Sequence, residues 1–211
     1  MNLENKIVFD ISPLISPQTA VFPGDTPFQQ DFLLKIANGK NLDLSTIKTT
    51  VHIGAHTDAP SHYHADGVSI EKRELKYYLG PAQVIEVNKA RGSRLYPDDL
   101  TQNIMAPRVL FKTNSFPDPN HWNNDFVSLS AELIEFLAAK NVILAGIDTP
   151  SVDPANDEGL ESHKAIFRYD MAILEGIVLT SVPEGIYDLI CLPLKIAGAD
   201  ASPVRAILLK S

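Results

Sequence analysis

Val109-Leu-Phe-Lys-Thr113 and Val142-Ile-Leu-Ala-Gly-Ile147 flank the segment Ala131-Glu-Leu-Ile-Glu-Phe-Leu-Ala-Ala-Lys140, and together they predict a strand, a helix and a second strand. Ser130 stands where the N-cap of the helix is expected, because its hydroxyl can accept a free backbone N–H of the first turn. The first half of the chain is richer in strand patterns. We therefore expect a mixed α/β fold whose sheet is partly antiparallel.

Shorter apolar or alternating runs predict the other strands. These are Lys6–Ile11, Phe28–Ile36, Asp43–His52, Ala82–Val87, Ile177–Thr180, Tyr187–Leu192 and Val204–Leu209. A second helix is expected within Glu161–Tyr169, and a short one over Ile70–Tyr78, which Gly80-Pro81 would end.

Length and composition favour one domain over residues 1–211, with 45% hydrophobic and 21% charged residues. The formal net charge of −8 argues against a nucleic-acid partner, because that affinity rests on positive charge. We find neither a signal peptide nor an apolar run long enough for a membrane span, so we expect a cytoplasmic protein. The phosphate-binding glycine motifs do not occur.

Four of the six histidines fall in one stretch of thirteen residues, His52-Ile-Gly-Ala-His56-Thr-Asp58-Ala-Pro-Ser-His62-Tyr-His64. On an extended chain His52, His56 and Asp58 face the same side. A straight strand would hold the two histidines about 13 Å apart, too far for one ion, so the chain must bend. We expect a strand end that curls into a turn. Two imidazoles and a carboxylate suit Zn²⁺, Mn²⁺ or Fe²⁺, and the alternative is a run of exposed loop histidines.

Other residues remain open on spacing alone. His62 is either a fourth ligand or a proton-transfer group, and His64, beside an Asp-Gly turn, favours a surface position. His163 is either a ligand or a helix-face residue. Glu175, between Leu174 and Gly176, is either a partnered buried carboxylate or a helix-terminal residue.

Two further features indicate structure rather than chemistry. Cys191 is the only cysteine, which fits a reducing compartment, and its apolar neighbours favour a core position over a nucleophile. His121-Trp122 lies in a Pro/Asn-rich loop that is either exposed or covers a pocket.

The pattern His52-x-Gly-x-His56-x-Asp58-x-Pro60-x-His62 resembles the signature of the metal-dependent cyclase family, which includes bacterial kynurenine formamidases (arylformamidases) and isatin hydrolases. The likeness runs nearly from end to end and is greatest to the formamidase branch. The segments that carry it are Val21–Pro27, Gly146–Asp153, Ile173–Gly176, Val182–Tyr187, Leu192–Lys195 and Asp200–Ala206.

The resemblance implies a swivelling β/β/α type of mixed α/β domain with a binuclear site. His52, His56 and Asp58 would hold one ion, and His163 and Glu175 would complete the pair. Asp58 and Glu175 would be shared between the ions, which would be zinc, with manganese as the alternative. His62 would be the catalytic proton donor or acceptor.

The resemblance also implies hydrolysis of N-formyl-L-kynurenine to L-kynurenine and formate, in tryptophan degradation, by a homodimer or larger homo-oligomer. Phe22 stands where the formamidases carry Trp against the substrate ring, which loosens the inference of an aryl formamide substrate. Ala55 fits the formamidase branch. The alternatives are a related cyclic amide or lactone hydrolase, such as an isatin hydrolase, and a non-catalytic metal-binding protein of the same fold.

Overall fold

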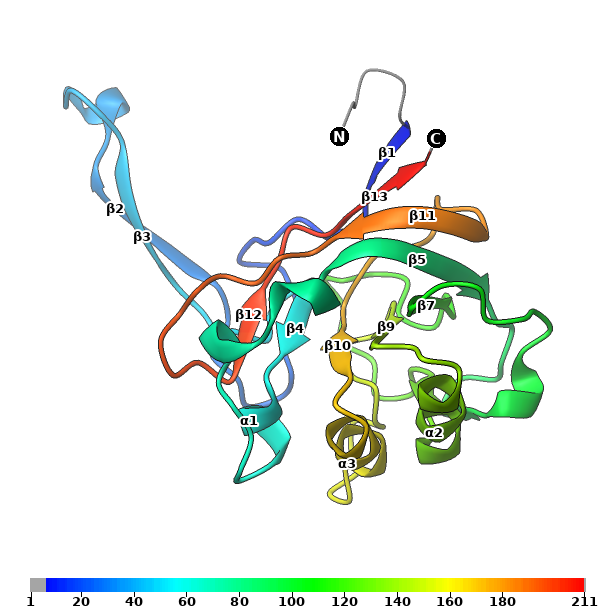
Figure 1. Cartoon of the computed structure of the whole chain (residues 1–211). Helices are drawn as coiled ribbons and strands as arrows, with labels where there is room; N and C mark the ends of the chain where they lie inside the picture. The colour runs from blue at the N-terminus through cyan, green and yellow to red at the C-terminus, as the bar shows by residue number, and fades with distance from the viewer. Residues whose placement is uncertain (1–6, 211) are drawn as a thin grey trace.

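A seven-stranded mixed sheet is the centre of the computed structural model, which describes residues 7–210 (Figure 1). In spatial order its strands are β1 (Ile7–Asp10), β13 (Ile207–Lys210), β11 (Gly185–Ile190), β5 (Leu79–Glu86), β7 (Arg108–Lys112), β9 (Leu144–Ile147) and β10 (Ala172–Leu174). The pairs from β1 to β5 are antiparallel, and those from β5 to β10 are parallel. The expected mixed α/β fold with a partly antiparallel sheet is confirmed. Lys6, the first residue of the strand predicted over Lys6–Ile11, lies outside the described residues.

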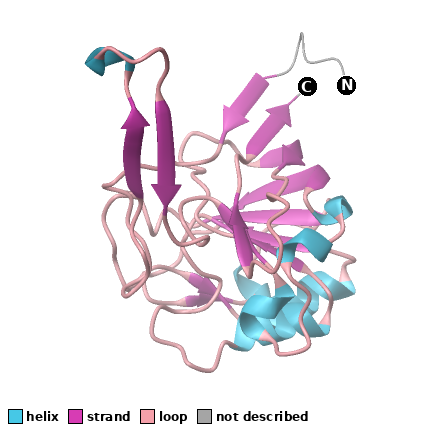
Figure 2. Cartoon of the chain, turned by 90° about the vertical axis from the view of Figure 1, so that its left-hand side faces the viewer, coloured by secondary structure: helices cyan, strands magenta, loops and turns pink. Residues whose placement is uncertain are grey.

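Two helices, α2 (Ala131–Ala139) and α3 (Glu161–Arg168), pack on one face of the sheet (Figure 2). The predicted cap of α2 is confirmed, since the Leu133 N–H donates to Ser130 Oγ at 3.0 Å. The sheet has one apolar core on each face, and successive side chains of β7 alternate between them. Val109 and Phe111 belong to the core on the helix side, and Leu110 belongs to the core on the other face. A strand covered on both faces explains the continuous apolar run of this segment.

Two of the predicted secondary-structure elements are wrong. Instead of a helix over Ile70–Tyr78 the chain makes two 3₁₀ turns, Ile70–Lys72 and Leu75–Tyr77. Instead of a strand, Ile177–Thr180 is a loop that buries Ile177 and Leu179, and the strand lies just before it, at β10. Apolar side chains of both segments cover the core opposite the helices, to which Tyr78, Ile177 and Leu179 belong.

Three two-stranded ladders and several short turns complete the fold. The ladders join β2 (Gln29–Leu34) to β3 (Leu44–Lys48), β4 (His56–Asp58) to β12 (Ala201–Pro203), and β6 (Arg94–Leu95) to β8 (Ser128–Leu129). The turns are η1 (Ile36–Asn38), α1 (Pro60–Tyr63) and η4 (Pro97–Asp99). The β2–β3 hairpin stands away from the rest of the molecule in both views (Figures 1 and 2). Within residues 7–210, no helix has the length and apolar character needed to cross a membrane.

The parallel half of the sheet determines where polar side chains gather. Asp148 directly follows β9, and Glu175 directly follows the neighbouring strand β10. Open α/β sheets bind ligands beyond the carboxyl ends of their parallel strands. The His52–Asp58 segment reaches the same edge, because His56 forms a β-bridge with Glu175.

Candidate metal centre and active site

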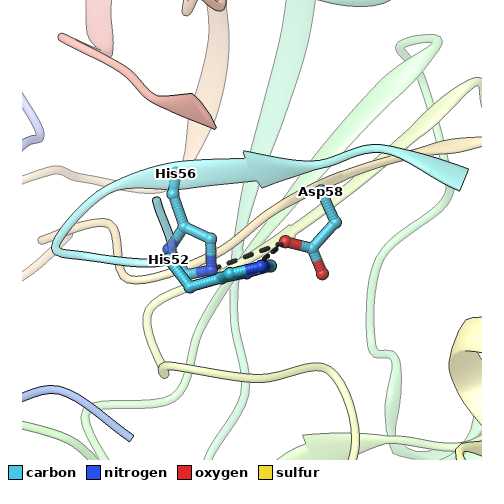
Figure 3. A group of neighbouring side chains, drawn as sticks. All are labelled: His52, His56 and Asp58. Carbon is cyan, nitrogen blue, oxygen red and sulfur yellow. Dashed lines mark ion pairs between the residues drawn. The ribbon is translucent and has the colours of Figure 1, made fainter. Parts of the chain in front are cut away.

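A bend followed by a short strand brings His52, His56 and Asp58 together (Figure 3). The bend passes through Gly54, whose φ of +59° lies in the left-handed region that favours glycine. His56 and Asp58 then project from the same side of β4, as the two-residue period requires. The sequence predicts a bend of this kind, but it places the strand before the turn, whereas the structure places β4 after it.

The three side chains offer donor atoms to a common point. Asp58 Oδ1 lies 3.0 Å from His52 Nδ1 and 3.7 Å from His56 Nε2. One donor atom from each residue lies within 4.8 Å of the other two. His56 Nδ1 contacts the carbonyl oxygen of Gly54 at 2.9 Å, and a carbonyl can only accept, so Nδ1 carries the proton. The Nε2 lone pair of His56 therefore faces the cluster.

Glu175 and His163 lie on the other side of the same cluster. Backbone hydrogen bonds in both directions join Glu175 to His56, at 2.9 and 3.0 Å. Glu175 Oε2 lies 3.1 Å from His56 Nε2, and its Oε1 lies 3.9 Å from His163 Nε2. His163 Nε2 also lies 3.4 Å from Asp58 Oδ2. Each carboxylate thus turns one oxygen toward His56 and the other toward His163.

His163 lies on helix α3, and its orientation is fixed by Asp153, a residue to which sequence reasoning gave no role. Asp153 Oδ2 accepts the Nδ1–H of His163 at 2.7 Å and its backbone N–H at 3.0 Å. Its other oxygen accepts the Ser162 N–H and an Arg94 N–H. A carboxylate at a helix N-terminus is favourable, and here it also fixes the imidazole with Nε2 toward the cluster. The only signal in the sequence is that Asp153 lies ten residues before His163. The contact between the two residues is visible only in the folded chain.

The pKa values in the cluster are shifted because its carboxylates and imidazoles lie close together. Burial lowers the pKa of His163, yet hydrogen bonds to Asp153 and Asp58 outweigh it and raise that pKa to about 10. Burial also lowers the pKa of His52, but Asp58 and Asp200 raise it to about 9. Burial alone would raise the pKa of Asp58, whereas His163 and His52 hold it well below its usual value. Burying a charged carboxylate is costly unless hydrogen bonds or a cation compensate it, and the cation here can be a protonated imidazole or a metal ion.

The donor set fits divalent metal ions. Asp58 Oδ1 is buried, yet no hydrogen bond satisfies it within the described chain. An orphaned carboxylate oxygen is costly unless a ligand takes it up. Imidazole nitrogens and carboxylate oxygens are the donors that Zn²⁺, Mn²⁺ and Fe²⁺ accept. All five residues of the predicted ligand set lie at this one point: His52, His56, Asp58, His163 and Glu175.

The two remaining histidines of the motif lie differently. The His62 side chain, on α1, is 36% exposed, lines the cavity, and its ring centre is 4.2 Å from that of His52. His64 stacks on Phe167 at 3.7 Å and does not line the cavity. His62 also belongs to two further groups of possible donors, one with Asp58 and His163 and the other with His52 and Asp200. Geometry alone therefore leaves His62 as either a ligand or a proton carrier.

A cavity of about 620 Å³ opens over the cluster, a volume typical of small-molecule sites. Its lining includes an aromatic group, in which Phe22 and Trp122 meet edge to face at 5.1 Å and Phe116 packs against Trp122. Of the two possibilities that the sequence allows for His121-Trp122, each holds for one residue: Trp122 lines the pocket, and His121 is exposed. Cys191 is fully buried in the core and lies outside the cavity, as the sequence favours.

Comparison with known proteins gives consistent matches over nearly the whole chain. The family described as "Putative cyclase" matches residues 9–154. The kynurenine formamidases of Bordetella petrii and Bordetella pertussis are each 43% identical over 205 residues, covering 96% of this chain and 98% of theirs. A solved structure described as a potential metal-dependent hydrolase with cyclase activity has a TM-score of 0.84 at 28% identity, with 98% of both chains covered. Isatin hydrolase A from Ralstonia solanacearum shares the fold, with a TM-score of 0.83 at 24% identity over 98% of this chain and 93% of that one.

Proposed function

Because this chain belongs to the cyclase family, we propose that its cavity is the active site of a metal-dependent amide hydrolase that converts N-formyl-L-kynurenine into L-kynurenine and formate. The kynurenine formamidases that it resembles cover almost its full length. The observation that carries the proposal is a largely buried five-residue donor set that lines one cavity together with aromatic side chains. We also propose one domain over residues 1–211. The support is that β1, near the start of the chain, pairs with β13, near its end, in the same seven-stranded sheet.

The proposed cofactor is a pair of divalent ions, zinc or, as the alternative, manganese. His52, His56 and Asp58 would hold one ion, and His163 and Glu175 the other. Support for a pair comes from Asp58 and Glu175, each of which directs its two oxygens to opposite sides of the cluster. Bound there, such ions polarise a carbonyl and lower the pKa of water.

The proposed substrate contacts follow from the walls of the cavity. The aryl ring packs against Phe22 and Trp122, and the formyl group lies over the donor cluster. Asp25 also lines the cavity and suits the substrate's ammonium group, which isatin lacks, whereas the cavity residue Asp157 is paired with Arg94. Among the described lining residues there is no Lys or Arg, so we place the α-carboxylate at the open mouth.

His62 is the proposed proton carrier. Hydrolysis joins a water oxygen to the formyl carbon and breaks the carbon–nitrogen bond, so the leaving aryl amine must gain a proton. His62 lies at the cavity wall and is half-exposed, so it can collect the proton from water and deliver it to nitrogen. Such transfer is worth roughly 10²–10⁴ in rate.

The experiment that tests this function is metal analysis of protein purified without chelators, joined to assays on N-formyl-L-kynurenine, isatin and an aliphatic formamide. We expect about two metal equivalents and release of L-kynurenine, loss of activity with chelator, and recovery with Zn²⁺ or Mn²⁺. His64→Ala is the matched control, because His64 lies outside the cavity. Full activity after metal removal would refute the mechanism, and tight metal without turnover of any amide would favour a non-catalytic protein.

The proposal includes a homodimer or larger homo-oligomer in the cytoplasm. The projecting β2–β3 hairpin exposes apolar side chains that water disfavours, including Leu33 at 74% and Ile47 at 61%. A second copy covering them would account for that exposure. Light scattering during gel filtration tests it: Ile47→Lys should shift the mass toward the monomer, and an unchanged monomer for the native chain would refute it.

A further inference from the structure

Asp200 lies between His52 and His62 and contacts both rings with a single oxygen atom. Its Oδ2 is 3.0 Å from His52 Nε2 and 3.3 Å from His62 Nδ1. The two ring centres are 4.2 Å apart, so one carboxylate oxygen can reach both imidazoles. Sequence reasoning places Asp200 within a segment of resemblance but assigns it no role.

Backbone hydrogen bonds hold Asp200 in place. Strand β12 begins at the next residue, and its Ala201 pairs with Asp58 on β4. The Asp200 carbonyl accepts the N–H of Ala59 at 2.8 Å, and Ala59 in turn accepts the N–H of His62 at 2.9 Å. Asp200 is therefore tied to the chain that carries both the donor cluster and His62.

A carboxylate can only accept hydrogen bonds, so both rings must offer it an N–H. A metal ion binds neutral imidazole, so in the metal-loaded site His52 with its proton on Nε2 would offer the ion the lone pair of Nδ1, the nitrogen that lies 3.0 Å from Asp58 Oδ1. His62 with its proton on Nδ1 keeps the lone pair of Nε2 free to accept a proton. One oxygen thus selects the tautomer of a metal ligand and the tautomer of a proton carrier at once.

We propose that Asp200 is a positioning residue that sets the tautomer and orientation of both His52 and His62, which couples metal binding to proton transfer. This inference rests on the proposed function, since it assigns Asp200 to act through residues of that site. Asp200, His52 and His62 could also offer one donor atom each to an ion, so a ligand role for Asp200 is the alternative that the zinc stoichiometry below distinguishes. The side chain is 49% exposed, which leaves it accessible to water beside His62.

The first test is a double-mutant cycle between Asp200→Ala and His62→Ala in the metal-loaded enzyme. Removing the partner of an oriented imidazole costs roughly 10–100-fold in activity or metal affinity. We expect Asp200→Ala to lower kcat by about that factor in the native background, but by less than about threefold once His62 is gone. Asp200→Asn, whose amide oxygen can occupy the same place, should recover part of the loss. Equal losses in both backgrounds would overturn the proposal.

The second test does not need turnover, so it separates this inference from the proposed substrate. Nitrogen-15 spectra of histidine side chains in the zinc-loaded protein should show His62 with its proton on Nδ1, and Asp200→Ala should abolish that preference. Chelator competition should show zinc affinity weakened about 10–100-fold with unchanged stoichiometry at saturation. An unchanged tautomer would overturn the proposal. Loss of one zinc equivalent at saturation would make Asp200 a ligand instead.

Glu71→Ala is the matched control for both tests. Glu71 holds the same loop through the Gly198 N–H at 3.2 Å and contacts neither imidazole. If loosening this loop were enough to explain the Asp200 variants, Glu71→Ala would reproduce them. We expect it to leave the tautomers and the kinetic coupling unchanged, and the same losses in Glu71→Ala would overturn the assignment.

Discussion

Gly176 follows Glu175 of the donor cluster, and the structure leaves no room for a side chain at position 176. Its φ is +64°, and a Cβ atom at this position would lie 2.1 Å from the carbonyl oxygen of Gly54. Ordinary contact begins at 3.4 Å, so one backbone must move by about 1.3 Å. That carbonyl also accepts the Nδ1–H of His56, so the displacement reaches the donor cluster directly.

The expected cost of Gly176→Ala has two parts. The left-handed conformation costs a residue with a Cβ about 1–2 kcal/mol. Overpacking against a fixed backbone adds about 1–3 kcal/mol. We therefore expect a loss of about 2–5 kcal/mol from the free energy of unfolding, a large share of the 5–15 kcal/mol of a typical domain. A displacement of about 1 Å at the site would lower kcat about 100-fold.

Gly39→Ala is the matched control. Gly39 has a φ of +76°, and nothing lies within 4 Å of its Cβ position, so this variant bears the conformational strain alone. Urea unfolding should give a loss of about 1–2 kcal/mol for Gly39→Ala and a clearly larger loss for Gly176→Ala. Metal analysis should find full occupancy only in the control. Equal destabilisation of the two variants, with metal content intact in both, would refute the reasoning.

Three further predictions concern single side chains. His62→Ala should keep both metal equivalents while kcat falls roughly 10²–10⁴-fold; loss of about one equivalent would make His62 a ligand, and Asp58→Asn, which should lose metal under either role, is the control. Trp122 is the only tryptophan and lines the cavity, so an aryl ligand should change the intrinsic fluorescence, corrected for ligand absorption; no change at saturation would remove Trp122 from the site. Burial raises the pKa of the Cys191 thiol, so a thiol reagent should find no reactive group in the native protein and one per chain in urea; rapid native reaction would contradict its burial.

The sequence predicts best those parts of the fold that local interactions determine. The strand–helix–strand order around Ala131–Lys140 is confirmed, because a capped helix and two apolar strands each leave a local pattern. The prediction at Ile177–Thr180 is wrong because burial produces an apolar run with or without a strand partner. Whether backbone groups pair with a neighbouring strand depends on residues far away in sequence.

The candidate site shows the same division. The spacing of His52, His56 and Asp58 predicts convergence, and the resemblance adds His163 and Glu175. Asp153 and Asp200 escape both approaches, because each acts on an imidazole that only the folded chain brings near. Supporting carboxylates resemble ordinary surface acids in a sequence, and their geometry is the only property that sets them apart.

Strand β4 carries His56 and Asp58 in the first third of the chain, yet its hydrogen-bonded partner β12 comes about 140 residues later. Ribosomes add roughly 5–20 residues per second, so β4 waits several seconds for the strand that completes it. His163 and Glu175 also emerge long after the first three donors. We therefore expect the nascent chain to hold an incomplete cluster through most of translation and to load its metal as a late step of maturation.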